Sequence, residues 1–266
     1  MQEYSVLMKS RSVCMRKETF DSSILVSIIT VCRNSEATIR TTIESVLHQS
    51  YENIEYILID GASSDGTVDI IRSYEKDFAE RDFSYHYISE PDEGIYDAMN
   101  KGIHLATGAI VGMINSDDWY EQEAVSVAVK AYRQQPYDLF YADLRIIGDR
   151  GSFIKKSRNS NWITSRYWNH PTTFIPRRIY DQYQYKNENI HDDWDLILRI
   201  RKEKEDCKVC VVNKVLANFR RGGVSHERSI RKALKRARIK YRIYRDNEYS
   251  RWYAVECYGM EIAKLI

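Results

Sequence analysis

No apolar run in this sequence approaches the roughly 20 residues that a helix needs to span a bilayer. The N-terminus also lacks the apolar core that is typical of a signal peptide. The five cysteines are odd in number and scattered along 266 residues, which indicates reduced thiols and not a disulfide framework. We therefore expect a cytoplasmic protein whose contact with a membrane, if any, is peripheral.

Two common phosphate-binding motifs are missing as well. The apolar run 25–31 predicts a first buried strand, but no Gly-x-Gly-x-x-Gly follows it, which argues against a dinucleotide-binding fold. No Gly-x-x-x-x-Gly-Lys-Ser/Thr is present, which argues against a phosphate-loop NTPase. Cys207 and Cys210 have the spacing of a redox motif, but they fall in a predicted strand, which disfavours a redox or metal role. A net charge of +2 implies no partner by itself.

What is present predicts an α/β fold. Hydrophobic residues make up 43% of the chain, enough for a sizeable core. Up to residue 134, apolar runs typical of buried strands alternate with stretches of helical periodicity. Strands are predicted at 25–31, 54–59, 83–88 and 110–114, and helices at 35–49, 67–74, 95–106 and 121–134. This alternation predicts right-handed βαβ units and a Rossmann-like, mostly parallel central sheet flanked by helices.

After residue 137 the pattern changes. Short strands are predicted at 138–142, 145–147 and 153–156, a helix at 193–201, and two further strands around Asn213 and Lys214. We expect residues 1–23 to form a poorly ordered lead-in, residues 24–226 one main domain, and residues 227–266 a basic and aromatic helical appendage.

Asp117 and Asp118 directly follow the buried strand 110–114. Two adjacent carboxylates at such a place are costly unless a cation or hydrogen-bond donors meet them. In an open α/β sheet, ligands bind at the carboxyl ends of the strands, and a hard divalent cation that joins carboxylates to a phosphate-bearing substrate fits there. The pair alone fits equally well a helix N-cap for a helix that starts near Glu121.

Polar segments also follow the first two strands, and all three strand ends should open on the same edge of the sheet. Together with later segments, they resemble family 2 glycosyltransferases of the GT-A fold, especially small bacterial enzymes of exopolysaccharide and O-antigen (colanic-acid-type) assembly. The resemblance covers about residues 24–226. Its motifs are residues 28–34, 59–67, 90–102, 106–108, 115–118, 170–174, 193–199 and 219–225.

The resemblance implies a nucleotide-diphosphate-sugar donor, with a UDP-sugar favoured and a GDP-sugar possible, bound by residues 24–120. It also implies Mn²⁺ or Mg²⁺, held chiefly by Asp118, with Asp117 in the ribose or metal shell and His226 as a further metal ligand. Asn115 stands where many relatives carry Asp, so we do not count it as a ligand. The residues implied in donor binding are Thr30, Arg33, Asp60, Asp65, Asn100, Lys101 and Asp117.

Each of these assignments has a plainer alternative. Asp60 and Asp65 could simply form turns, and Asn100 and Lys101 could lie at an exposed helix end. Arg220 and Arg221 could meet the diphosphate or belong to a solvated loop.

An inverting transfer needs a base that takes the proton of the acceptor hydroxyl. The resemblance implies Asp193 for this role, with Asp192 second, in an acceptor half formed by residues 121–226; either could instead cap the helix that follows. His170 and Trp194 are implied in acceptor contact. The acceptor would be a glycan or a polyprenyl-linked saccharide of surface polysaccharide synthesis.

Two other functions are weaker. A sugar nucleotidyltransferase should carry a Gly-rich first loop with Arg or Lys, which is absent after Val31. A catalytically inactive module that binds nucleotide-sugars or glycans would not need Asp118 and Asp193.

The segment 228–251 carries ten Lys or Arg against two acidic residues, a net charge of +8. Interleaved with aromatic residues, this charge suits an anionic membrane surface; we expect no nucleic-acid partner. The alternative is a helix that packs on the main domain.

Overall fold

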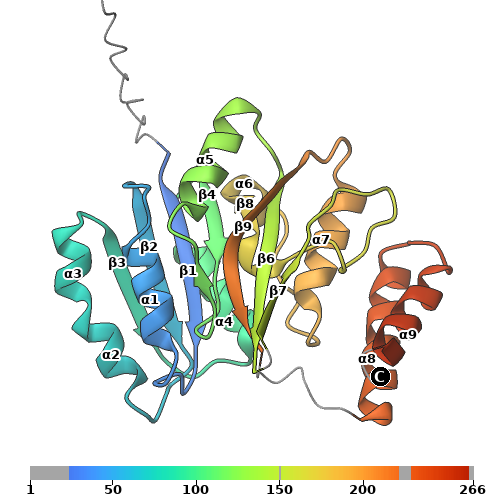
Figure 1. The fold of residues 1–266 in the computed structure, drawn as a ribbon, viewed down its shortest axis with the longest axis horizontal. Helices are drawn as coiled ribbons and strands as arrows, with labels where there is room; N and C mark the ends of the chain where they lie inside the picture. Colours follow the sequence, from blue (N-terminus) through green and yellow to red (C-terminus); the bar gives the residue numbers. More distant parts are fainter. Residues whose placement is uncertain (1–23, 150, 222–228, 264–266) are drawn as a thin grey trace, which may run out of the picture.

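The computed structural model describes residues 24–149, 151–221 and 229–263 and contains one mixed sheet between two helical layers (Figure 1). The strand order is β3-β2-β1-β4-β8-β6-β9-β5, with β7 paired to β6. The strands are β1 (Val26–Cys32), β2 (Ile54–Asp60), β3 (Ser84–Ser89), β4 (Ile110–Met113), β5 (Trp119–Tyr120), β6 (Leu139–Gly148), β7 (Gly151–Lys155), β8 (Phe174–Pro176) and β9 (Val209–Arg220). The helices are α1 (Ile39–Leu47), α2 (Thr67–Ser73), α3 (Glu75–Glu80), α4 (Ile95–Leu105), α5 (Ala124–Gln134), α6 (Arg177–Tyr180), α7 (Asp192–Glu203), α8 (Ile230–Asp246) and α9 (Tyr253–Ala263), with a 3₁₀ turn, η1, at His170–Thr172.

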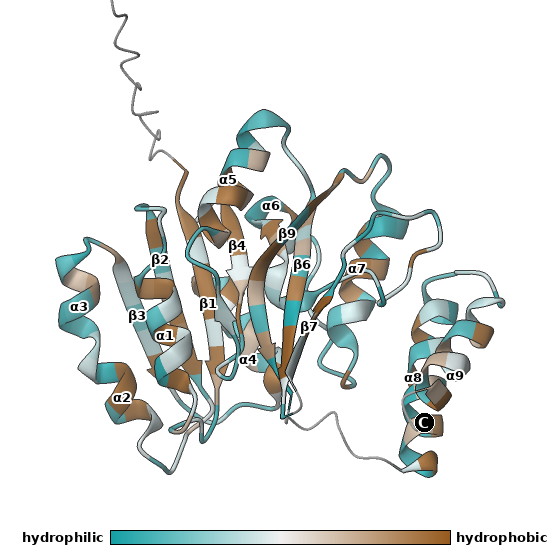
Figure 2. Cartoon of the chain, in the orientation of Figure 1, coloured by the Kyte–Doolittle hydropathy of each residue, from teal (hydrophilic) through white to brown (hydrophobic). Residues whose placement is uncertain are grey.

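The first half of the sheet is parallel, as the sequence predicts. β1 pairs in parallel with β2 and β4, and β2 pairs in parallel with β3. β1 and β2 are buried along their whole lengths, which explains their unbroken apolar sequences. Figure 2 shows β1 largely in the hydrophobic colour. β3, the weakest of these strands in sequence, is the partly exposed edge.

The second half of the sheet is mixed, which differs from the mostly parallel sheet expected. β8 pairs antiparallel with both β4 and β6, β6 pairs antiparallel with β7, and β9 runs parallel to β6. The separate strands predicted at 138–142 and 145–147 are one strand. The two strands predicted on either side of Asn213 and Lys214 are also one strand. Ala142 pairs with Val212 and Asp143 pairs with Val215, so Asn213 and Lys214 form a bulge.

Apolar side chains fill both faces of the sheet. α1, α2, α3 and α5 contribute to a core on one face, and α4, α6 and α7 contribute to a core on the other. Cys207 lies two residues before β9 and Cys210 is its second residue, and burial raises the pKa of the Cys207 thiol to about 11. A raised pKa is the opposite of what a redox cysteine needs.

The appendage packs on the main domain through α8 and the start of α9. Tyr244 is 2% exposed, and its hydroxyl donates to the Ile163 carbonyl over 2.9 Å. The Asn247 amide donates to Asp195 of α7 over 2.7 Å in the buried interior. The packing alternative therefore describes this face of the appendage. None of the helices in the described ranges is both long enough and apolar enough to cross a membrane.

We predict that Tyr244→Ala lowers the free energy of unfolding by about 3–5 kcal/mol, because it removes a fully buried aromatic ring. Trp252→Ala is the matched control: this ring is 73% exposed, so we expect a change within about 0.5 kcal/mol. Urea denaturation measures both. Equal, small effects would mean that the appendage does not pack as described.

Candidate functional site

The loops after β1 and β2 are joined at the end of the sheet where these strands finish, which we call the carboxyl edge. The parallel register aligns Cys32 with Asp60 at the two strand ends. The Asn34 N–H donates to Ser63 Oγ over 2.7 Å, and Asn34 Oδ1 accepts from the Ser64 N–H over 2.8 Å. Asn34 has φ 49°, in the left-handed region that asparagine tolerates better than most residues.

The loop after β4, which carries the aspartate pair, joins the same edge. Ser35 Oγ lies 2.8 Å from Ser116 Oγ, and Thr42 of α1 donates its hydroxyl to the Asp118 carbonyl over 2.6 Å. The three loops that the sequence places at one edge do lie together there.

Two residues predicted to contact the donor point inward. Asp60 is buried and accepts from the Ser63 N–H over 2.9 Å and from the Ser89 hydroxyl over 2.6 Å. Thr30 is also buried, and its Oγ1 accepts from the Tyr56 hydroxyl over 3.0 Å. The turn-forming interpretation therefore describes Asp60. The prediction for Thr30 meets a physical obstacle, because alternate residues of a strand face opposite sides and Thr30 faces the core.

Arg33 and Asp65 are exposed at the carboxyl edge. Asp65 accepts from the Thr67 N–H over 3.1 Å and from the Glu36 N–H over 3.2 Å. These hydrogen bonds, led by the one from the Thr67 hydroxyl, hold the pKa of Asp65 below its usual value. Asp65 thus shapes the start of α2 while it stays at the surface.

Asn100 and Lys101 are neighbours on α4 with different partners. The Asn100 side chain donates to the Tyr185 carbonyl over 2.8 Å and accepts from the Tyr185 N–H over 3.1 Å. Lys101 forms ion pairs with Glu90 at 2.9 Å and Asp97 at 3.4 Å. Lys101 therefore borders the 90–94 loop, whereas both polar ends of the Asn100 amide are used within the protein.

Asp118 has the most unusual environment at the carboxyl edge. It is fully buried, and its Oδ1 accepts from the Arg220 N–H at the end of β9 over 3.1 Å. Its Oδ2 is buried without a hydrogen-bond partner among the described residues, and so is Asn115 Oδ1. Burial, with a smaller contribution from the charge of Asp117, raises the pKa of Asp118 to about 8. Neither aspartate caps α5, because that helix begins only at Ala124.

This donor set fits a hard divalent cation. An ionised carboxylate with an unsatisfied buried oxygen is costly, and a cation would remove that cost. Asp117, half-buried and also raised in pKa by burial, can supply a second oxygen. No cluster of three or more His, Cys, Asp or Glu side chains is found in the described ranges, so other ligands would have to come from substrate or water. His226 lies outside the described residues.

Asp193 lies among three side chains from other segments of the chain. It is half-exposed at the start of α7. Its charge adds to the rise that burial causes in the pKa of Tyr96, and it opposes the lowering that burial imposes on the pKa of His170. The Tyr185 hydroxyl lies 3.5 Å from both His170 Nε2 and the Met113 sulfur at the end of β4. Tyr185, which the charge of Asp193 reaches, therefore contacts the end of β4, the strand that the aspartate pair follows.

Asp192, the second candidate for the base, is occupied by its own turn. It is buried, and its Oδ2 accepts from the Asn189 N–H over 3.0 Å and from the Glu188 N–H. Its other oxygen accepts from the Asn189 side chain. This geometry suits a structural turn, and it leaves Asp193 as the carboxylate with an open side.

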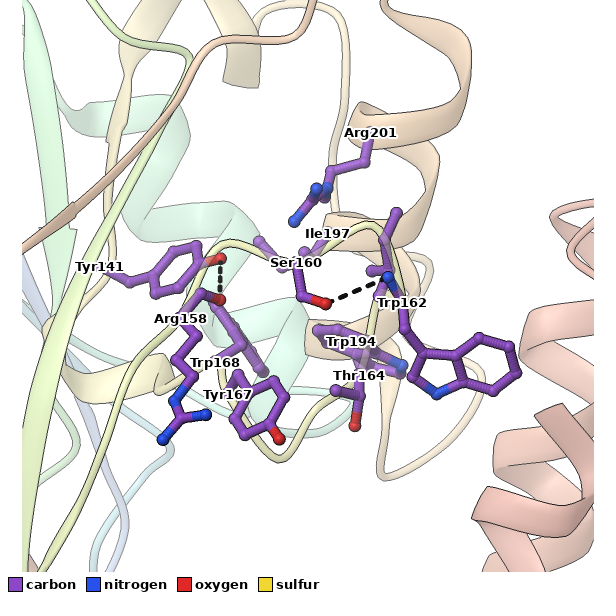
Figure 3. Close-up of a pocket in the computed structure, with 11 residues that line it drawn as sticks. Tyr141, Arg158, Ser160, Trp162, Thr164, Tyr167, Trp168, Trp194, Ile197 and Arg201 are labelled. Carbon is purple, nitrogen blue, oxygen red and sulfur yellow. Dashed lines mark hydrogen bonds between the residues drawn. The ribbon is translucent and has the colours of Figure 1, made fainter.

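Trp194, predicted to contact the acceptor, lies in the core. It is 3% exposed, and its ring packs at 5.3 Å from Trp168 and 6.2 Å from Tyr244. Figure 3 shows it beside a cavity bordered by Tyr141 and Arg158, whose hydroxyl and carbonyl are 3.1 Å apart. At about 10 Å³ this cavity holds no more than one water, so it is no sugar site. Trp194 therefore anchors α7 in the core, and the cavity that it borders is too small for a sugar.

The sequence missed Tyr96, Tyr185 and the backbone of Arg220. Tyr96 lies inside the 90–102 motif, so its position was a usable signal, but a tyrosine at helical spacing looks like an ordinary core residue. Nothing in the sequence indicates that Tyr185 meets His170, or that the Arg220 N–H reaches Asp118.

Three comparisons place the chain among known proteins. The family described as "Glycosyl transferase family 2" matches residues 27–213. A PGL/p-HBAD biosynthesis glycosyltransferase of Mycobacterium tuberculosis is 33% identical over 138 residues, which are 51% of this chain and 49% of the relative. Escherichia coli chondroitin synthase is 27% identical over 76% of this chain and 31% of its own length. The match thus spans about half of the mycobacterial relative.

Two solved structures share the fold. S. aureus TarS 1–349 in complex with UDP-GlcNAc superposes with a TM-score of 0.68 at 16% identity, over 91% of this chain and 72% of that one. The mannosyltransferase PcManGT from Pyrobaculum calidifontis, in complex with GDP-Man and Mn²⁺, gives a TM-score of 0.63 at 14% identity, over 91% of this chain and 76% of that one. The GT-A fold expected from the sequence is confirmed.

The environment of Asp118 predicts a pH-dependent effect on stability. A carboxyl whose pKa is raised by folding contributes stability below its unfolded pKa of about 3.9, and that stability is lost as the pH rises through the folded value of about 8. In EDTA, Asp118→Asn should therefore unfold at a higher temperature relative to wild type at pH 8 than at pH 5. Asp69→Asn, exposed on α2, is the control and should show no such trend. An Asp118→Asn effect independent of pH would contradict the assignment.

Proposed function

Because this chain belongs to glycosyl transferase family 2, we propose that it transfers a sugar from a nucleotide-diphosphate-sugar to a saccharide acceptor. The observation that carries the proposal is the buried Asp118 carboxylate, with one oxygen unpaired, at the carboxyl edge of a GT-A sheet. Structural relatives were solved in complex with UDP, UDP-GlcNAc and GDP-Man, and we favour a UDP-sugar here.

The donor would lie over the three loops of the carboxyl edge. Arg33 and Asp65 are exposed at this edge and would contact the nucleoside. Lys101 of α4 donates to the Pro91 carbonyl and so borders the same region beside the 90–94 loop. The Arg220 guanidinium lies over the Trp119 ring at 5.3 Å, and its charge acts on both aspartates of the pair. An arginine held over an aromatic ring is well suited to meet a diphosphate.

Asp118 and Asp117 would hold Mn²⁺ or Mg²⁺. When bound, such an ion offsets the charge that develops on the departing diphosphate. Asp118 would ionise in its presence in spite of burial, because the cation favours the charged carboxylate.

We assign the base to Asp193, which makes the transfer inverting. Asp193 would accept the proton of the acceptor hydroxyl while that oxygen bonds to the anomeric carbon. The bond between this carbon and the diphosphate oxygen breaks, and the nucleoside diphosphate leaves with the electron pair. His170, whose pKa is lowered by burial and raised in part by the charge of Asp193, would hydrogen-bond the acceptor.

A nucleotide-release assay tests the donor site. With UDP-, GDP- and dTDP-sugars in turn, we expect release from one class in Mn²⁺, and Asp118→Asn should lower it by about 10²-fold or more, because the metal contributes several kcal/mol. Equal rates for Asp118→Asn and wild type, with both sensitive to EDTA, would overturn the metal assignment. No release from any donor would favour an inactive binding module.

The base is tested by steady-state kinetics. Asp193→Asn should leave donor affinity unchanged and lower kcat by about 10²–10⁴-fold, the usual contribution of a general base. Asp192→Asn should mainly lower the unfolding temperature, because it disturbs the 188–192 turn. If Asp192→Asn is the inactive, stably folded variant, the two roles are exchanged.

We also propose that the outer face of α8 binds the anionic cytoplasmic face of a membrane, where a lipid-linked acceptor would reside. Arg231, Lys235, Arg238 and Arg242 are all exposed and recur every three to four residues, so they form one stripe. Trp252, just before α9, and Val255, in its first turn, are 73% and 70% exposed. Basic residues near an anionic surface contribute about 1 kcal/mol each, and exposed apolar side chains can insert.

Vesicle sedimentation tests this surface without removing the packed helix. The wild-type protein should sediment with anionic vesicles at low salt and be released as ionic strength rises. Arg238→Glu combined with Arg242→Glu should abolish sedimentation, whereas Lys130→Glu with Arg133→Glu, an exposed pair on α5, should not. No sedimentation of wild type at low salt would reject the proposal.

A further inference from the structure

The segment 185–187 connects α4 to the turn that carries Asp193. Asn100, in the second turn of α4, holds the Tyr185 backbone through both ends of its amide, at 2.8 and 3.1 Å. The Asn187 side chain donates to the Glu93 carbonyl over 3.3 Å, just before α4 begins. Three hydrogen bonds thus attach residues 185–187, which precede Asp193 in the chain, to α4 and to the donor-side loop 90–94 just before it.

Aromatic contacts complete this connection. The Tyr96 ring, one turn before Asn100, stacks on the Tyr185 ring with centroids 5.3 Å apart. Tyr96 and Tyr185 are each 6% exposed, so neither can move independently of the core. The Tyr185 hydroxyl in turn lies 3.5 Å from His170 Nε2. Tyr96, Tyr185 and His170 therefore form a fixed wall on one side of Asp193.

We infer that Asn100 and Tyr96 are positioning residues that hold Asp193 in place, and that Asn100 is not a contact to the nucleoside as its sequence motif implies. The inference rests on the proposed role of Asp193 as base. Turning the Asn100 amide toward the nucleoside would break both of its hydrogen bonds to the Tyr185 backbone. Helix α4 begins directly after the donor-side loop 90–94, and its first two turns contact Tyr185 in the segment that precedes Asp193. The helix therefore sets the distance between the donor and the proposed base.

The electrostatics around Asp193 agree with this placement. The pKa of Tyr96 is raised, mainly by burial and next by the charge of Asp193, so its hydroxyl stays protonated and can donate to the carboxylate. The titratable groups that surround Asp193 are Tyr96 of α4, His170 of η1, Tyr185 and the adjacent Asp192.

Two conservative variants test the inference against a nucleoside contact. Asn100→Asp replaces one donor of the amide by an oxygen that opposes the Tyr185 carbonyl, and Tyr96→Phe removes the hydroxyl but keeps the stacked ring. Both should bind UDP and Mn²⁺ within about twofold of wild type by calorimetry. Both should lower kcat, by up to about 10²-fold for a displacement near 1 Å.

The controls separate the possible failures. His104→Ala changes an exposed residue at the far end of α4 and should match wild type in both measurements. Weaker UDP binding by tenfold or more with unchanged kcat in Asn100→Asp would establish a nucleoside contact and overturn the inference. Wild-type kcat in both variants, with Asp193→Asn inactive, would also overturn it while the proposed function stands. If Asp193→Asn is itself fully active, the proposed base fails as well.

Discussion

The buried carboxylate of Asp118 is the constraint on which the rest of the site depends. It lies in the loop after β4, where Thr42 of α1 holds the Asp118 main-chain carbonyl, yet the described residues give the carboxylate a single hydrogen bond, from the Arg220 N–H at the end of β9. A charge buried in this way is unfavourable in the protein alone. The arrangement makes physical sense if a cation that binds with the substrate neutralises this charge. The free protein is then less stable, and the substrate-bound protein gains the interaction.

The second half of the sheet creates that environment. Antiparallel pairing brings β8 beside β4, and with it η1 and His170. β9 returns parallel to β6 and ends at Arg220, above the aspartate pair. In the same half, α7 begins at the turn that Asp192 closes, which leaves Asp193 directed toward Tyr96 and His170. The donor loops therefore follow strands of the first half of the sheet, whereas the proposed base lies on α7, between β8 and β9 in the chain.

Much of the donor half could be predicted from the sequence, because fully buried parallel strands have unbroken apolar sequences and their polar ends are easy to locate. The direction of individual side chains could not. Thr30 and Asp60 sit at the right strand ends but satisfy neighbours in the core and the turn. Trp194 follows the proposed base in sequence, but helical geometry turns it into the core. The bulge in β9 looked like a break between two strands, and only tertiary pairing with β6 shows otherwise. For the appendage, composition revealed the charge, while the packing of Tyr244 and Asn247 depends on partners far away in sequence.

The central claim is that Asp118 holds a divalent cation together with the nucleoside diphosphate. The most direct measurement is the affinity for Mn²⁺, followed by electron paramagnetic resonance, with and without UDP or GDP. The account predicts that the nucleotide tightens Mn²⁺ binding to the wild-type protein and that Asp118→Asn abolishes this coupling, with Asp69→Asn behaving as wild type. Mn²⁺ binding that is coupled to nucleotide equally in Asp118→Asn and in wild type would contradict it.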